Sequence, residues 1–100
     1  MDFNELRQLQ ISERNSSLPQ KVSNELYNEM DELLAEENNL NLIRSINVVA
    51  NEIKRLRFNK IINNAKHIVE TNNERELLNL TEEETEFYKK CVSLFRSWYQ

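Results

Sequence analysis

The hydrophobic positions of this chain recur at the three- and four-residue spacing of an α-helix in four separate stretches. In the first stretch, Phe3, Leu6 and Leu9 share one face of a short helix. Asp2 is a residue type that caps a helix start, and the helix is expected to end near Glu13 because a polar loop segment follows.

The second stretch begins after Asn15–Ser17, a typical loop segment. Proline is favoured in the first turn of a helix, so a second helix is expected from Pro19 to about Glu37. Asn38–Asn39 should end it. Its apolar side chains fall on one stripe: Val22, Leu26, Met30, Leu33 and Leu34.

The third helix is expected to be the longest, from about Asn41 to Val69, with its apolar positions within an arc of about 140°. Thr71–Asn73 interrupts it, and a short turn is expected over Glu74–Leu78. The segment Thr81–Glu84 has the pattern of a capping box and should start a last helix. The pattern predicts one all-α domain over residues 1–100, a four-to-five-helix bundle around one long central helix.

The last helix carries an unusually wide apolar arc of about 160°. Either this helix is central to the core, or part of the arc covers another subunit. Trp98 aligns with Phe87, Cys91 and Leu94 and is expected in the chain's own core. Tyr88, Phe95 and Tyr99 of this helix are expected at a subunit contact, by default across a two-fold axis, with Phe58 of the third helix contributing.

Composition removes most enzyme classes. The 100 residues include no glycine, so a Walker loop, a dinucleotide fingerprint and a nucleophile elbow cannot be built. One histidine and one cysteine cannot form a standard zinc site. No apolar run approaches eighteen residues, so no membrane span is expected. We expect a binding or scaffold protein that is not an enzyme and needs no cofactor or metal.

A few side chains could still carry chemistry. His67 lies at the edge of the apolar arc of the long helix, where a structural role is favoured over a ligand or a general base. Cys91 is expected to pack as a small hydrophobe. The acidic residues at the start of the last helix could bind a hard cation, but a solvated helix start explains them better.

Charge is segregated along the chain, with a net −6 over residues 1–38, +5 over 39–69 and −3 over 70–100. A basic face is expected on the third helix, formed by Arg44, Lys54, Arg55 and Lys66. This face either is solvated or contacts DNA. Since about four cations make a weak electrostatic footprint, DNA binding is expected to be weak or indirect.

Arg57 and Lys60 are exceptional because both project into the apolar stripe of the third helix. In one interpretation their aliphatic stems cover the core and their charged ends reach water. In the other, Arg57 forms a partly buried ion pair with Glu13 or with a glutamate of the second helix. Both alternatives stay open at this point.

Three segments together resemble a known family. Phe3–Arg14, followed by Leu18-Pro19, resembles the opening of archaeal GINS subunits. Arg57-x-x-Lys60-Ile61 is similar to the Arg-x-x-Lys-Ile helix of that family. Asn79-Leu80-Thr81-x-Glu83-Glu84 resembles its Asn-Leu-Thr-x-Glu-Glu start to the last helix.

The resemblance implies a helical A domain of the subunit type in which A precedes a small β-rich B domain, which these residues do not contain. It implies a homo- or hetero-tetramer with other GINS subunits in the cytoplasm, associated with the nucleoid. That tetramer would support the MCM helicase in DNA replication and meet a Cdc45 or RecJ-like partner through the B domain. The alternative is an unrelated helical interaction module, or a small regulator that binds nucleic acid through the third helix.

Overall fold

The computed structural model describes residues 1–73 and 76–100, and they form four α-helices with no strand among them. The helices are α1 (Phe3–Arg14), α2 (Leu26–Glu36), α3 (Leu40–Thr71) and α4 (Glu82–Tyr99). The all-α prediction with one long helix is confirmed. The short turn expected over Glu74–Leu78 lies partly outside the described residues, and residues 76–78 are irregular.

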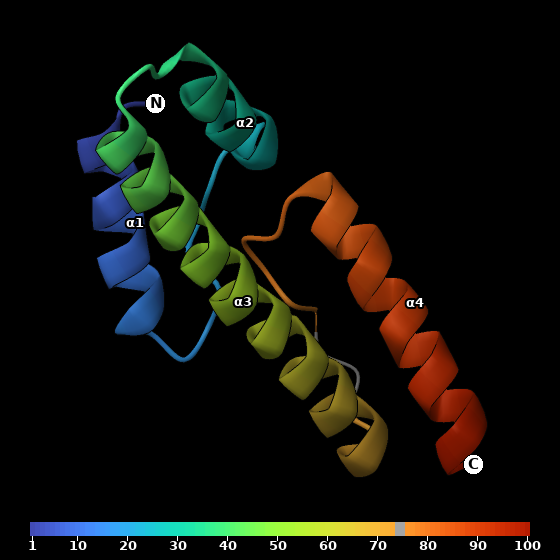
Figure 1. Cartoon of the computed structure of the whole chain (residues 1–100). Helices are drawn as coiled ribbons and strands as arrows, with labels where there is room; N and C mark the ends of the chain where they lie inside the picture. Colours follow the sequence, from blue (N-terminus) through green and yellow to red (C-terminus); the bar gives the residue numbers. More distant parts are fainter. Residues whose placement is uncertain (74–75) are drawn as a thin grey trace.

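α3 is the spine of the molecule (Figure 1). Its 32 residues span about 48 Å, close to the longest dimension of the chain, 51 Å. α1 and α2 pack against its first half, and α4 lies beside its second half. Residues 76–81 run back along α3 before α4 begins, so that α3 and α4 point in the same direction (Figure 1).

Side-chain caps fix three of the helix starts. The carboxylate of Asp2 accepts a hydrogen bond from the Glu5 amide at 2.8 Å. The Asn39 side chain accepts from two amides at the start of α3. The capping box of α4 is present as expected, with the Glu84 amide donating to the Thr81 hydroxyl and the Thr81 amide donating to the Glu84 carboxylate.

α2 begins at Leu26, so the expectation that it starts at Pro19 was wrong. The intervening segment is irregular because long-range hydrogen bonds engage its backbone. The Gln20 amide donates to the Glu13 carboxylate at 3.2 Å, and the Gln20 carbonyl accepts from Arg57 at 2.8 Å. The Gln20 carbonyl is therefore not available to accept a hydrogen bond within a helix that starts at Pro19.

The core is divided into two clusters along α3. The first joins α1, α2 and the first half of α3, around Leu6, Met30 and Ile53. The second joins the second half of α3 to α4, around Ile61, Tyr88 and Cys91. Arg57, which is fully buried, lies on α3 between the two.

α4 is rotated about its axis relative to the expectation from its apolar pattern. Trp98 was expected in the core but is 86 % exposed, and Leu94 and Phe87 also face outward. Tyr88 was expected at a partner's surface but is 8 % exposed and belongs to the second cluster. Glu84 explains this orientation. It shares a face of α4 with Tyr88 and Cys91, and its carboxylate accepts hydrogen bonds from Arg57 on α3, so this face is turned toward α3.

Candidate functional site

The most highly connected group in the molecule is the guanidinium of Arg57. It donates five hydrogen bonds, which is the number of N–H groups that arginine has. Two of them reach Glu84 on α4 at 2.7 Å, and one reaches Glu13 on α1 at 2.9 Å. The other two reach the carbonyl oxygens of Gln20 and Asn79. Arg57 thus ties α1, α4 and both long connections to the middle of α3.

Lys60, one helical turn further along α3, holds the end of α1. Its ammonium donates to the Glu13 carboxylate and to the Glu13 carbonyl, both at 2.6 Å. It also donates to the Ser16 hydroxyl at 3.1 Å and to the Leu18 carbonyl at 3.3 Å. The structure therefore brings the ion-pair candidates Arg57, Lys60 and Glu13 together.

The second carboxylate of the network, Glu84, was not identified from the sequence. It accepts from Arg57, from the Thr81 amide and from the Tyr27 hydroxyl, the last at 2.6 Å. Of the two alternatives left open by the sequence, the structure selects Glu13 as a partner of Arg57, while α2 contributes Tyr27 to the network. An available signal was that Glu84 shares a stripe with Tyr88 and Cys91.

Hydrogen bonding decides the charge state of this network. Burial alone would raise the pKa of Glu84, but the hydrogen bonds from Arg57, Thr81 and Tyr27 hold that pKa below its ordinary value. Burial would also lower the pKa of Arg57, but Glu84 and Glu13 raise it above its ordinary value. Burial, together with the hydrogen bond to Glu84, raises the pKa of Tyr27. Glu84 and Arg57 are therefore ionised at neutral pH, and Tyr27 is neutral.

This network contains two cationic side chains, Arg57 and Lys60, and two carboxylates, Glu13 and Glu84. We call it closed because its buried polar atoms all have hydrogen-bond partners. Among the described residues, every buried side-chain nitrogen and oxygen has a hydrogen-bond partner. Arg57 and Glu13 have no exposed side-chain surface. A network of this kind fixes the positions of the helices that it joins.

The basic face lies on α3, as the sequence predicts. Arg44, Arg55 and Lys66 are exposed on α3 at intervals of eleven residues, which places them within about 40° on one side of the helix. Lys54 is also exposed, and its ammonium lies 5.9 Å from the centroid of the Tyr27 ring. These cations form no ion pair within the described part of the chain.

An exposed apolar surface, here called the aromatic strip, lies next to this face. It consists of Phe58 on α3 and Phe87, Leu94 and Trp98 on α4. The Phe58 and Phe87 rings stack with centroids 5.8 Å apart. Of the other interface candidates, Tyr99 is exposed and Phe95 is half-buried against the second cluster. The strip is a surface of the kind that binds partners.

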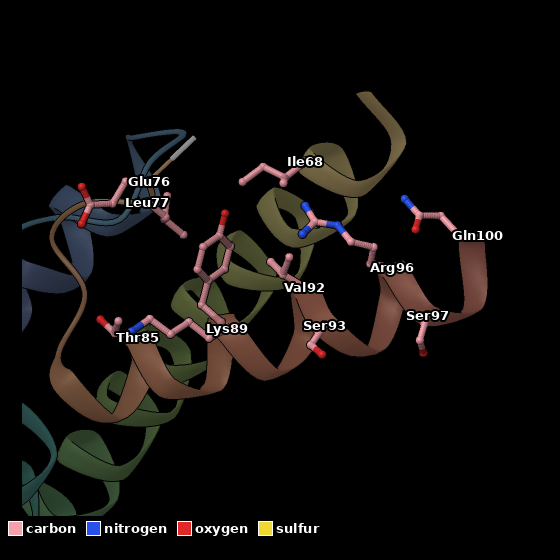
Figure 2. Close-up of a pocket in the computed structure, with 11 residues that line it drawn as sticks. Ile68, Glu76, Leu77, Thr85, Lys89, Val92, Ser93, Arg96, Ser97 and Gln100 are labelled. Atoms are coloured by element: carbon pink, nitrogen blue, oxygen red, sulfur yellow. The ribbon is translucent and has the colours of Figure 1, made fainter. Parts of the chain in front are cut away.

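An open groove of about 870 Å³ lies along the opposite side of α4 (Figure 2). Val92 and Arg96 point across it toward Ile68 of α3, while Ser93 and Ser97 lie on the outer side of the helix. The remaining residues that line the groove are of mixed polarity: Glu76, Leu77, Thr85, Tyr88, Lys89 and Gln100.

The two isolated candidates for chemistry remain apart from each other. His67 is exposed on α3. Cys91 is buried in the second cluster, where burial raises the pKa of its thiol. Over residues 1–73 and 76–100, no three acidic, histidine or cysteine side chains are grouped so as to hold a metal ion. The same residues include no helix long and apolar enough to cross a membrane.

Comparison with protein families gives a match that covers the whole chain. The model of the Sld5 family, described as the GINS complex protein helical bundle domain, matches residues 1–100. The chain belongs to this GINS family. Searches of curated proteins and of solved structures returned no match for it.

In this GINS chain, the three segments that resemble the family meet at one place. The first contributes Glu13 and the Leu18 carbonyl, and the second contributes Arg57 and Lys60. The third contributes the Asn79 carbonyl and Glu84. The residues that carry the resemblance therefore build the buried network, which positions the helices of the GINS bundle.

Proposed function

We propose that this chain is a non-catalytic scaffold subunit of a GINS-like tetramer that supports the MCM helicase in DNA replication. The observation that carries the proposal is the match of the GINS helical bundle domain to all 100 residues. The closed ion network agrees with a scaffold, because its groups are occupied in holding helices.

The exposed surface of the chain also supports assembly with other subunits. Leu94 is 67 % exposed and Trp98 is 86 % exposed, on the same side of α4 as the Phe58–Phe87 stack. A contiguous apolar surface of this kind is costly to leave in water, and it is typical of a chain that works in a complex. Other GINS subunits are the partners that the family assignment favours.

The finer parts of the proposal concern domain type and distant partners. We infer that residues 1–100 form the A domain of an archaeal subunit type in which A precedes B. A B domain, on this or another chain, would then meet a Cdc45 or RecJ-like partner. The helical domain would contribute to the tetramer, which works at the nucleoid in the cytoplasm.

Co-purification tests this function. A tagged form of the chain is co-expressed with a companion GINS chain from the same genome and with MCM. We expect the tag to retain both, and the assembled complex to increase DNA unwinding by MCM. If the tag retains neither protein, or if the complex leaves unwinding unchanged, the proposed function is wrong.

A further inference from the structure

One long side of α3 is left uncovered by the other three helices (Figure 1). Three cations of the basic face are exposed on this side at intervals of eleven residues: Arg44, Arg55 and Lys66. Eleven residues correspond to about 16 Å along the helix axis and return nearly to the same side. Because α3 is one continuous helix of 32 residues, these cations form a straight row with a fixed spacing.

Acidic side chains of the chain do not neutralise this row. Glu52 is the one acidic residue between Leu40 and Val69. Its carboxylate is already bound by the Arg14 guanidinium, at 2.8 Å and 2.9 Å. The row therefore forms a positive surface that attracts anions, although the chain as a whole carries a net charge of −4.

Two side-chain amides lie among the cations. Asn51 and Asn59 are exposed, and on a helix of 100° per residue they fall with the three cations within about 80°. Amide side chains and cations are the groups that contact phosphate oxygens in DNA complexes, where they position a protein without reading the sequence. The basic face therefore has the composition of a phosphate-binding surface.

The spacing of the cations suits a duplex better than an isolated phosphate group. The major groove of DNA is about 12 Å wide and has a row of phosphates on each side. A rigid helix that crosses this groove with cations about 16 Å apart brings one cation to each row. An isolated phosphate would be contacted by one cation of the row only, because the next cation is too distant.

We propose that the basic face of α3 binds the phosphate backbone of duplex DNA once the chain is part of its complex. The inference rests on the proposed function and adds DNA as the partner of this face. About three phosphate contacts are too few for strong binding by the isolated chain. A weak contact becomes effective when another part of the same complex holds the DNA nearby.

Single-stranded DNA fits this face less well than a duplex does. Proteins that bind single strands stack the bases on aromatic rings. Phe58 is the one Phe, Tyr or Trp residue of α3, it lies at the edge of the face, and its ring stacks on Phe87. The face thus offers phosphate contacts without a platform for bases, which favours a duplex whose bases are already stacked.

An acidic protein surface would also be attracted by the cations. Protein contacts depend on large apolar anchors, and the exposed residues of this kind are gathered on the aromatic strip. Among the exposed residues between Arg44 and Lys66 on this side of α3, Val48 is the one aliphatic residue. These observations favour DNA, and contact with an acidic protein is an outcome of the test.

The test is a fluorescence anisotropy titration of a labelled DNA duplex with the co-purified GINS complex, at salt concentrations from about 50 mM to about 200 mM. The face variant combines Arg44→Gln with Lys66→Gln. The matched control combines Arg7→Gln with Lys21→Gln, which removes two exposed cations outside α3 and changes the net charge equally. All four positions are exposed, so helical content and unfolding midpoints should match the wild type.

We expect the face variant to raise the dissociation constant for the duplex about tenfold at about 100 mM salt. The slope of the logarithm of the binding constant against the logarithm of the salt concentration should become shallower by about 1.8, because two phosphate contacts are lost. The control should bind like the wild type. Two duplexes of unrelated sequence should give equal constants, since phosphate contacts carry no sequence information.

Three results would overturn the inference and leave the proposed function standing. The first is a face variant that binds the duplex like the wild type, and the second is a control that loses as much affinity as the face variant. The third is a face variant that keeps duplex binding but loses single-stranded oligothymidylate or MCM, which would assign the face to a single strand or to a protein.

A failure of the proposed function is recognised separately, because no complex then co-purifies. The same comparison is made in that case with the isolated chain at about 20 mM salt, where screening is weak. A loss of duplex binding confined to the face variant would still support the DNA contact. Equal binding by the wild type and the face variant would refute it.

Discussion

Arg57 uses all of its hydrogen-bonding capacity inside the molecule, and this determines what its loss costs. Without the guanidinium, Glu13 and Glu84 would remain buried with fewer partners. An uncompensated buried charge is far more costly than the loss of an exposed ion pair. Arg57 therefore stabilises the fold by compensating two buried carboxylates, although arginine is usually found on protein surfaces.

We expect Arg57→Ala to lower the free energy of unfolding by about 3–5 kcal/mol. Arg55→Ala, two residues earlier on the exposed side of α3, is the matched control and should change it by at most about 0.5 kcal/mol. Urea unfolding followed by circular dichroism measures both. If Arg57→Ala unfolds at the wild-type midpoint, the guanidinium does not hold the helices together.

Acid should weaken the same network through Glu84. Because its pKa is lowered in the folded chain, the stabilisation it gives is present above its ordinary pKa of 4.5. That stabilisation is lost as the pH falls through the lower folded-state pKa. We expect stability to fall more between about pH 6 and about pH 3 in the wild type than in Glu84→Gln. Equal slopes for the two proteins would contradict the role of this carboxylate.

Residue chemistry explains which members of the network could be named from the sequence. Arg57 and Lys60 interrupt an apolar stripe, and a cation in such a position requires an acidic partner or a path to water. The ion pair of Glu84 with Arg57 was not predicted, because the capping box already explains an acid three residues after Thr81. Glu84 both caps α4 and binds Arg57. The contact with Arg57 joins residues that are 27 positions apart in the sequence.

At the scale of helices, the periodicity of apolar residues predicted all four helices. It did not predict where α2 begins or which face of α4 is buried. α2 begins later than its pattern predicts because Arg57 engages the carbonyl of Gln20. The orientation of α4 could not be read from its pattern, since two adjacent apolar stripes compete for the core. The hydrogen bonds of Glu84 to Arg57 favour the stripe with Tyr88 and Cys91.

Trp98 reports the orientation of α4 directly, since it is the one tryptophan of the chain. We expect the dilute chain to show emission typical of solvent-exposed indole, and acrylamide to quench it efficiently, because the side chain is 86 % exposed. Addition of the companion GINS chain should reduce the quenching. A shielded Trp98 in the dilute monomer would place the other stripe outward and contradict the orientation described here.

At the scale of the whole molecule, the charge pattern of the sequence becomes a set of separate surfaces. Part of the basic middle of the chain is neutralised internally, because Arg57 and Lys60 bind Glu13 and Glu84. The other cations of this segment stay on the exposed side of α3, while the acids of α2 lie elsewhere on the surface. The sequence indicated the basic face, but the neighbouring aromatic strip depends on the packing of α4 and appeared only in the structure.

Binding of duplex DNA by the isolated chain should be weak. The exposed basic face offers about four cations, fewer than the 6–10 phosphate contacts of proteins with a strong salt dependence. We expect a dissociation constant well above micromolar at about 150–200 mM salt, measured by fluorescence anisotropy. A submicromolar, sequence-independent constant would favour a nucleic-acid-binding regulator over a scaffold subunit.

The stoichiometry of the chain with its companion GINS subunit tests the scaffold function most directly. Native mass spectrometry of the co-expressed, co-purified proteins measures it without a label. The account requires a tetramer that contains this 12.0 kDa chain, and a loss of that species in the variant Trp98→Ala. A chain that stays at its monomer mass beside the companion would contradict the account.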